Sequence, residues 1–581
     1  MMTEGRWSLD ALYPSYESSQ YQEDVKRFEG LFKDLEGLEL QDNLETVHQV
    51  IALMEELEVL TYRLYSYSSL QLSADTGDEA SLKAKGRLMK IMSAGAASLS
   101  RVRKFLGQSQ VDLSQDDLLK HYDFFFQTAR KEASHLLSDE VEEVISTLNM
   151  SGGSSWEQMQ GFLTSTVEED FQGRKINLSE IRNLAYSSDP DLRKAAYETE
   201  LAMYDSIKEP VAFSLNNIKS QVNDLTRMRG YESPLAATLE QSRMTQATLD
   251  ALLDAIKESL PAFRKYLKHK GHLLGHKNGL PFYDLFAPLG GEGSRTFTIE
   301  EDKDYLVDHF NKFSPDLADM VENMYQEEAL DIYPRRGKVG GAFCSNLPFI
   351  DTSRILLNFE GFLSDVVTMA HELGHAYHGV QIQDHRPLNW DYSMPVAETA
   401  STFNEALIME SLIKDADKEE RIALIESQLQ DVTQIIVDIY SRYLFEDGVF
   451  KAREDQFLFS KDLEALMLDA QKQAYGDGLD PDYLHPYMWV CKPHYYSTGL
   501  SYYNFPYAFG GLFSKGLYAL YQEEGDSFVP KYKEMLKATT VHSVEETAQA
   551  MGIDLTTKDF WLKALGQVQE QIDEFIALTQ E

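Results

Sequence analysis

Residues 365–380 read DVVTMAHELGHAYHGV and contain the pattern H-E-x-x-H at His371, Glu372 and His375. The flanking residues are apolar at helical spacing and include no proline, which predicts a helix. Positions i and i+4 lie on one face of a helix, so the two imidazoles can bind one metal ion from the same side. Zn²⁺ accepts His nitrogens as ligands, and Glu372 would project beside it and take a proton from water. The pattern therefore predicts a zinc-dependent hydrolytic site with Glu372 as the general base.

One poor helix former, Gly374, lies inside this predicted helix. A glycine in a helix interior costs about 1 kcal/mol relative to alanine. We expect that cost to be offset because a second backbone passes close to the helix at this point.

A third metal ligand must come from another segment. One class of zinc proteases uses H-E-x-x-H-x-x-G-x-x-H, but here His378 takes the glycine position and Gln381 takes the last histidine position. The alternative is a glutamate on the next helix, which gives a His₂Glu site with an open position for water. Glu398 and Glu405 are both candidates, because they are seven residues apart and lie near one face of the helix predicted for VAETASTFNEALIMESLI.

Bulk composition limits the possible partners. The chain has 581 residues, 94 acidic against 54 basic side chains, and a net charge of −40. That charge disfavours nucleic acid and anionic membranes as partners. Only two cysteines, Cys344 and Cys491, are present, which agrees with a reducing compartment. Neither a signal peptide nor a run of about 18 apolar residues is visible, so we expect a cytoplasmic enzyme.

Hydrophobic periodicity predicts a mainly α-helical chain. Long amphipathic helices are predicted before residue 113 and again between residues 198 and 277. Between residues 280 and 358 glycine, proline and β-forming residues replace this pattern and predict a small sheet just before the H-E-x-x-H helix. An exposed strand edge there could pair with an extended peptide, with RILLNF as the first candidate and GKVGGAF as the alternative. We predict an N-terminal helical domain over residues 1–195 and a catalytic domain over residues 196–581.

The stretches HELGHAYH and PVAETASTFNEAL together resemble the thimet oligopeptidase superfamily of zinc peptidases, and most closely its oligoendopeptidase F branch. The resemblance continues through RRGKVGGAFCS, KPHYY and YYNFPYAFG, and so covers most of residues 200–580. It implies a mainly α, two-lobed, zincin-like fold with a small sheet beside the H-E-x-x-H helix and a deep channel between the lobes. It also implies one zinc ion per chain and short unfolded peptides as substrates.

The same resemblance implies roles for further residues. Glu398 matches the family's third zinc ligand, which leaves Glu405 in a supporting position. The segment from His494 to Tyr507 can supply hydrogen-bond donors to the carbonyl oxygen under attack. His494 and Tyr507 are the first choices as catalytic donors. The predicted substrate-binding residues are Tyr502, Tyr503, Gly340 and Gly341.

Two other functions compete with a zinc oligoendopeptidase. A zinc carboxypeptidase of related helical fold would need a basic residue placed to bind a substrate C-terminus, and the sequence does not identify one. A non-catalytic peptide-binding protein on the same scaffold would have no use for Glu372 as a base.

Overall fold

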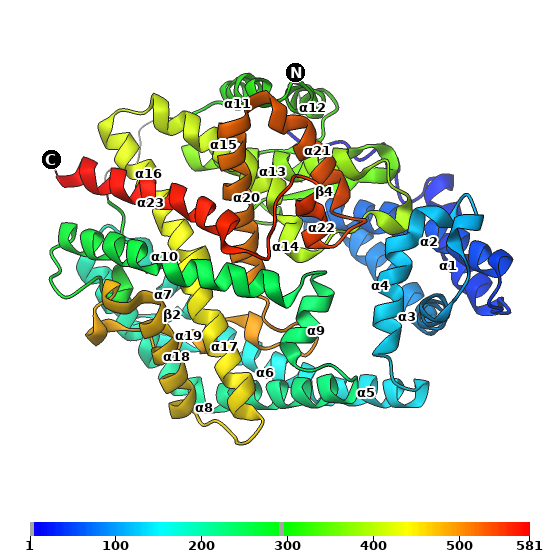
Figure 1. Cartoon of the computed structure of the whole chain (residues 1–581), viewed down its shortest axis with the longest axis horizontal. Coiled ribbons are helices and arrows are strands. Elements are labelled where there is room, and N and C mark those ends of the chain that lie inside the picture. The colour runs from blue at the N-terminus through cyan, green and yellow to red at the C-terminus, as the bar shows by residue number, and fades with distance from the viewer. Residues whose placement is uncertain (1–4, 290–295, 581) are drawn as a thin grey trace.

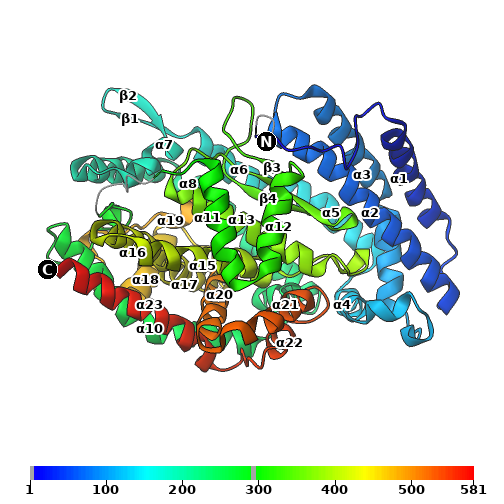
Figure 2. The same ribbon diagram turned by 90° about the horizontal axis from the view of Figure 1, so that it is seen from above.

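The computed structural model describes residues 5–289 and 296–580, and the chain is mainly helical (Figures 1 and 2). Its first helices are α1 (Ser19–Gly37), α2 (Leu44–Ala74), α3 (Glu79–Gln108) and α4 (Asp123–Ser134). Ser18, Asn43 and Asp78 accept backbone N–H groups at the starts of the first three and so satisfy donors that a helix leaves free. The apolar faces of these helices form one buried cluster at one end of the molecule, which also includes Leu347 and Leu356.

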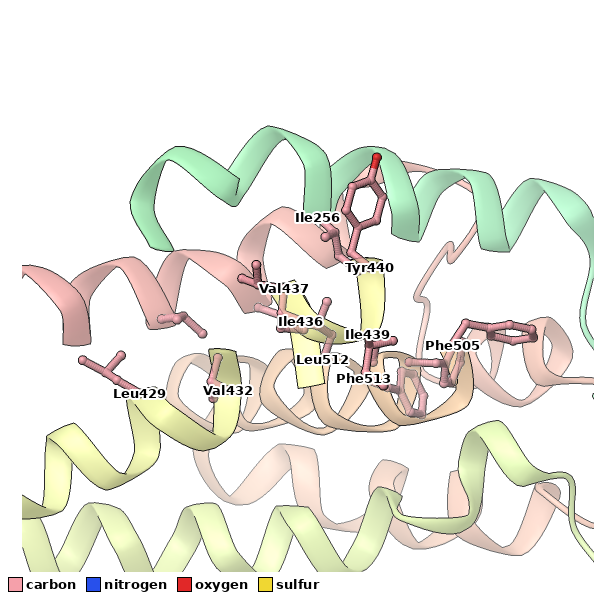
Figure 3. Close-up of a cluster of buried hydrophobic side chains, with 14 of the residues drawn as sticks. Ile256, Leu429, Val432, Ile436, Val437, Ile439, Tyr440, Phe505, Leu512 and Phe513 are labelled. Atoms are coloured by element: carbon pink, nitrogen blue, oxygen red, sulfur yellow. The ribbon is translucent and has the colours of Figure 1, made fainter. Parts of the chain in front are cut away.

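A second, larger buried cluster extends from Phe171 to Ile576 and joins most of the later helices. Figure 3 shows part of this core, where Ile256, Val437 and Leu512 lie close together. The division into domains at residue 195 stays a prediction. The helices from residue 139 to residue 326 are α5 (Asp139–Ser151), α6 (Gly153–Thr166), α7 (Leu178–Asn183), α8 (Pro190–Met228), α9 (Pro234–Gln241), α10 (Gln246–Leu273), α11 (Ile299–Phe313) and α12 (Pro315–Gln326).

The C-terminal part of the chain surrounds a central helix, α13, which contains the H-E-x-x-H motif (Figure 1). Two long helices near the C-terminus, α20 and α23, pack on each other through Phe509 and Trp561. The helices from residue 363 to residue 580 are α13 (Leu363–Ile382), α14 (Met394–Ala397), α15 (Thr399–Asp415), α16 (Lys418–Thr433), α17 (Ile439–Arg453), α18 (Ser460–Tyr475), α19 (Met488–Cys491), α20 (Phe505–Glu524), α21 (Phe528–Ala538), α22 (Val544–Gln549) and α23 (Lys558–Gln580). Among the described residues, none of the helices combines the length and the apolar character that crossing a bilayer requires.

The predicted small sheet lies beside α13 and has the strand order β3-β5-β4. β3 (Leu330–Asp331) pairs parallel with β5 (Thr352–Leu356), and β4 (Phe343–Leu347) pairs antiparallel with β5. The expectation that RILLNF forms the edge is therefore wrong, because β5 is paired on both sides. Its nearly continuous buried pattern is typical of a central strand. The edge strands are β3 and β4, and β4 begins at the end of the alternative stretch GKVGGAF. A separate hairpin joins β1 (Glu168–Phe171) to β2 (Arg174–Asn177).

Helix α13 is held in place at its start and along its middle. The side chain of Asp365 accepts the backbone N–H groups of Glu360, Gly361 and Phe362 at 2.9–3.0 Å, so it caps the start of the helix. A side chain at Gly374 would collide with the backbone of Ala400 and Ser401, which confirms the expected close approach and identifies the second backbone as α15. Asn346 of β4 donates to the His375 carbonyl oxygen at 3.2 Å.

Candidate metal centre

Three potential metal ligands converge between α13 and the start of α15. The Nε2 atoms of His371 and His375 are 3.2 Å apart, and each lies 3.3 Å from Oε2 of Glu398. Glu398 lies at the junction of α14 and α15, where Ser401 donates to the same carboxylate oxygen at 2.9 Å. Within the described residues, this is the group of His, Cys, Asp or Glu side chains whose ligand atoms lie close enough together to hold one ion.

The spacing of these three atoms fits a tetrahedral metal ion. Metal–ligand distances of about 2.0–2.1 Å place the ligand atoms of a tetrahedral site about 3.3–3.4 Å apart, close to the 3.2–3.3 Å found here. Two nitrogens and one carboxylate oxygen form the donor set of a zinc site with one open position. The three side chains therefore fit a Zn²⁺ ion.

The electrostatics of the group also favour a cation. Burial raises the pKa of the Glu398 carboxyl, but the two imidazoles outweigh burial and hold that pKa well below its ordinary value. Burial disfavours a charge on His371, yet Glu398 and Glu405 together raise its pKa to about 10. Carboxylates thus surround the two imidazoles, and a bound cation would face that negative charge.

The general-base candidate, Glu372, lies next to His371 in the sequence but is not one of the three converging side chains. Its side chain is only 6% exposed, and burial raises the pKa of its carboxyl although His371 and His375 lower it. Burial raises the pKa of the Cys344 thiol in the edge strand β4, and the charge of the nearby Glu372 raises it further. Glu372 therefore has the two imidazoles and Cys344 of β4 as neighbours.

Two neighbouring side chains have roles other than metal binding. Glu405 forms a hydrogen bond with Nδ1 of His371, on the opposite side of that ring from the ligand atom. His378 is fully buried; its Nε2 hydrogen-bonds Thr539 at 2.8 Å and its ring stacks on Tyr392. His378 therefore belongs to the packing of the core.

The predicted hydrogen-bond donors His494, Tyr503 and Tyr507 lie together. The ring centroid of His494 is 5.1 Å from that of Tyr503 and 6.0 Å from that of Tyr507. Tyr507 is one turn before Gly510 in α20, and a Cβ on Gly510 would lie 3.4 Å from Cβ of Glu398. Residues three apart share one helix face, so Tyr507 lies on the face of α20 that meets Glu398.

The chemistry of these donors suits a neutral hydrogen-bonding role. Burial, with the charges of Arg442 and Lys492, lowers the pKa of His494, which keeps its imidazole neutral at pH 7. Among the described residues its Nδ1 atom is buried without a hydrogen-bond partner. Burial and Tyr503 raise the pKa of Tyr507 to about 12, so its phenol keeps its proton.

The other predicted substrate-binding residues lie apart from this group. Tyr502 is 3% exposed, and its hydroxyl already has a partner because it donates to Asp447 at 3.1 Å. Gly340 and Gly341 lie in the loop before β4, and the Gly341 carbonyl accepts from Asn358 at 2.8 Å. Gly341 lines a cavity of about 270 Å³ with Thr368, one helical turn before Glu372.

Two larger cavities have residues in their walls that act on the site, Glu405 in one and Lys492, whose charge reaches His494, in the other. One of about 1040 Å³ extends to Glu405 and has Lys515 and Asp431 in its wall. The other, of about 550 Å³, shares Tyr186 and Phe286 with it, so the two cavities adjoin. The wall of the second includes Lys492, which the sequence reading did not select. The signal was available, because a single lysine interrupts the apolar and aromatic run MWVCKPHYY.

Comparisons with known proteins find similar peptidases along the chain. The model of peptidase family M3 matches residues 183–567, and a model described as oligopeptidase F matches residues 112–168. The oligopeptidase PepF of Bacillus subtilis is 25% identical over 98% of this chain and 87% of its own length. The group B oligopeptidase PepB of Streptococcus agalactiae is also 25% identical, over 98% of this chain and 94% of its own.

Solved structures show the same fold. A putative peptidase from Chlamydophila abortus superposes with a TM-score of 0.87 at 22% identity, over 99% of this chain and 98% of that one. Oligoendopeptidase-F from Enterococcus faecium gives a TM-score of 0.71 at 19% identity, over 97% of this chain and 99% of that one. The helical architecture is thus shared along the whole chain.

Proposed function

The chain belongs to peptidase family M3, and from that premise we propose that it is a zinc-dependent oligoendopeptidase that hydrolyses internal bonds of short unfolded peptides. The observation that carries this proposal is the triangle of His371, His375 and Glu398 ligand atoms, 3.2–3.3 Å on each side. Relatives along the whole length are named oligopeptidases or oligoendopeptidase F. A peptide substrate is therefore the consistent choice.

We assign the zinc ligands to His371, His375 and Glu398, with one ion per chain. Bound there, zinc would supply Lewis-acid chemistry to water and to the substrate carbonyl. Glu405 orients the His371 ring through Nδ1, and metal-bound histidines usually have such a partner.

Glu372 acts as the general base in this proposal. Its burial and raised pKa bring its proton affinity closer to neutral pH, where a base can accept a proton and later release it. It takes one proton from the attacking water and passes it to the leaving amine. Each turnover therefore returns the carboxylate to its starting state.

His494 and Tyr507 stabilise the carbonyl oxygen as negative charge develops on it. Both side chains keep a hydrogen-bond donor at pH 7. Their rings form a cluster with that of Tyr503, and helix α20, which contains Tyr507, contacts Glu398 at Gly510. Fixed donors of this kind commonly contribute about 10²–10³ in rate. We assign substrate contacts to Tyr503, Gly340 and Gly341, and we place Tyr502 behind them as an anchor through Asp447.

The test compares the wild type with Glu372→Gln on internally quenched peptides, with and without a zinc chelator. Glu360→Gln is the matched control, because Glu360 is an exposed glutamate just before the same helix. We expect internal cleavage, read by mass spectrometry, to be lost in Glu372→Gln and in chelated wild type, and to return when zinc is added back. Full cleavage by Glu372→Gln would refute the mechanism, and release of single C-terminal residues would identify a carboxypeptidase instead.

A further inference from the structure

The cavity of about 550 Å³ that has Lys492 in its wall carries an unusual set of charges. Its wall includes the cationic side chains of Arg182, Arg193 and Lys492 and the acidic side chains of Glu200 and Asp438. Most of these groups are paired. Arg182 lies 3.3 Å from Glu200, and Arg193 lies 2.7 Å from Asp284.

Lys492 is the exception. Asp438 is the carboxylate that stabilises the charge of Lys492. It is already bound by Arg442 at 2.5 Å and by the Tyr475 hydroxyl at 3.2 Å. Within the part of the chain that the structure describes, the Lys492 ammonium makes no hydrogen bond and no ion pair. Burial and the charge of Arg442 lower the pKa of Lys492. A bound anion would give the ammonium the ion pair and hydrogen bond that it lacks.

The backbone holds this lysine in a fixed place. It directly follows α19, which Gln160 of α6 anchors by donating to the Val490 carbonyl at 2.9 Å. The Lys492 carbonyl accepts from Tyr495, a fully buried residue. The next residue but one is His494, whose ring contacts those of Tyr503 and Tyr507. A short, rigid segment thus joins the unpaired ammonium to the proposed donors.

We propose that Lys492 binds the C-terminal carboxylate of the peptide substrate in this cavity. The inference rests on the proposed peptidase function and adds a substrate preference to it. A peptide bound across the site would extend past His494 into the cavity, and its terminal carboxylate would supply the missing anion. The cavity shares Tyr186 and Phe286 with the larger one, and its volume of about 550 Å³ would hold only a few residues after the cleaved bond.

The other lysine of the two cavities does not offer the same site. Lys515 lies in the wall of the larger cavity with Glu405, Glu420 and Asp431, and both Glu405 and Asp431 stabilise its charge. An incoming carboxylate would meet those acids. Lys492, in contrast, has two neighbouring arginines, Arg182 and Arg442, for its one acidic neighbour Asp438. The anion site therefore belongs to Lys492.

The test uses pairs of peptides with one sequence, one ending in a free carboxylate and the other in an amide. For the wild type we expect kcat/KM at the same internal bond to be about tenfold or more higher for the free acid, the usual value of a charge-assisted hydrogen bond. In Lys492→Met the acid-to-amide ratio should fall to about one. In Lys492→Arg it should stay high. Lys515→Met, the matched control, should keep the wild-type ratio.

Equal rates for acid and amide in the wild type would overturn the proposal, as would an unchanged ratio in Lys492→Met or a lost ratio in Lys515→Met. An amidated peptide that ends in glutamate provides a further arm. If its rate matches the free acid, the site binds a side-chain carboxylate and our assignment is wrong; a slow rate supports it. Failure of the peptidase function itself is distinct, because then the wild type would cleave neither peptide.

Discussion

Nδ1 of His371 is hydrogen-bonded to a carboxylate oxygen of Glu405, while Nε2 of the same ring faces His375 and Glu398. The His371 imidazole thus contacts the Glu405 carboxylate through one ring nitrogen and the other two candidate ligands through the other. The two glutamates come from one helix and its N-terminal junction, so the packing of α15 on α13 sets both sides of the ring.

Glu405→Gln should weaken zinc binding by about 10–100-fold, the range found when the partner of a metal-bound histidine is removed. The amide can still accept a hydrogen bond, but it lacks the charge that makes the imidazole more basic. Zinc affinity, measured by competition with a fluorescent chelator, reports this directly. Glu410→Gln on the same helix is the control, because Glu410 pairs with Lys414 on the surface, and its affinity should match the wild type. Equal affinities for all three proteins would contradict the role of Glu405.

Gly374→Ala should destabilise the protein by about 1–3 kcal/mol or more, the usual cost of forcing extra volume into a packed interface. The new methyl group would meet the backbone of Ala400 and Ser401, which cannot move aside as a flexible side chain can. Chemical denaturation measures the change. Gly161→Ala in α6 is the matched control, since a Cβ there meets no neighbour within 4 Å. It should be neutral or stabilising by up to about 1 kcal/mol, and a similar loss in both variants would refute the packing argument.

Local motifs predicted the core of the site because its chemistry lies in short segments. The i, i+4 spacing of His371 and His375 needs only a helix, and the resemblance to oligoendopeptidase F is confirmed by the family models and the relatives. The residues alone could not separate Glu398 from Glu405. Both face α13, and the distinction depends on the turn between α14 and α15, which places Glu398 at the start of the helix.

Tertiary pairing explains what the sequence missed. Strand order depends on long-range hydrogen bonds, so the sequence favoured RILLNF over GKVGGAF as the edge, although β5 is paired on both sides. The unpaired state of Lys492 depends on Arg442 already binding Asp438, a contact between residues far from it in the chain. The position of Lys492 in an apolar and aromatic run is visible in the sequence, but neither the strand order nor the unpaired state of Lys492 has a local pattern that could reveal it.

Lys219→Met should cost about 3–5 kcal/mol, the usual effect of leaving one member of a buried ion pair alone. The Lys219 ammonium and the Glu446 carboxylate are 2.6 Å apart, and both side chains are at most 1% exposed. Glu446 also accepts the backbone N–H of Tyr502 at 3.1 Å, so the loss should loosen the segment of the proposed donors. Urea unfolding measures the stability.

The control for this ion pair is Lys33→Met, which removes an exposed i, i+4 pair with Glu29. Exposed pairs of this kind contribute little to stability because solvent screens them. If Lys219→Met costs no more than Lys33→Met, the Lys219–Glu446 pair does not stabilise the fold.

Asp302→Asn should stabilise the protein at neutral pH. Asp302 is fully buried, and neither carboxylate oxygen has a hydrogen-bond partner among the described residues. Burial, with the charge of Asp365, raises its pKa from 3.8 to about 8, and Tyr325 is the other titratable group that faces it. The folded state therefore keeps a proton that the unfolded chain loses.

The sign of the pH dependence follows from that difference in bound protons. Below about pH 4 both states hold the proton, and Asp302 contributes its full stability. As the pH rises from about 4 to about 8 the unfolded state ionises first, so stability falls by up to about 1.4 kcal/mol per pH unit. Asn cannot ionise, so the free energy of unfolding of Asp302→Asn should decline less over this window than that of the wild type. Asp304→Asn, at an exposed position of the same helix, should follow the wild-type curve; if Asp302→Asn follows it too, Asp302 is ionised in the folded protein.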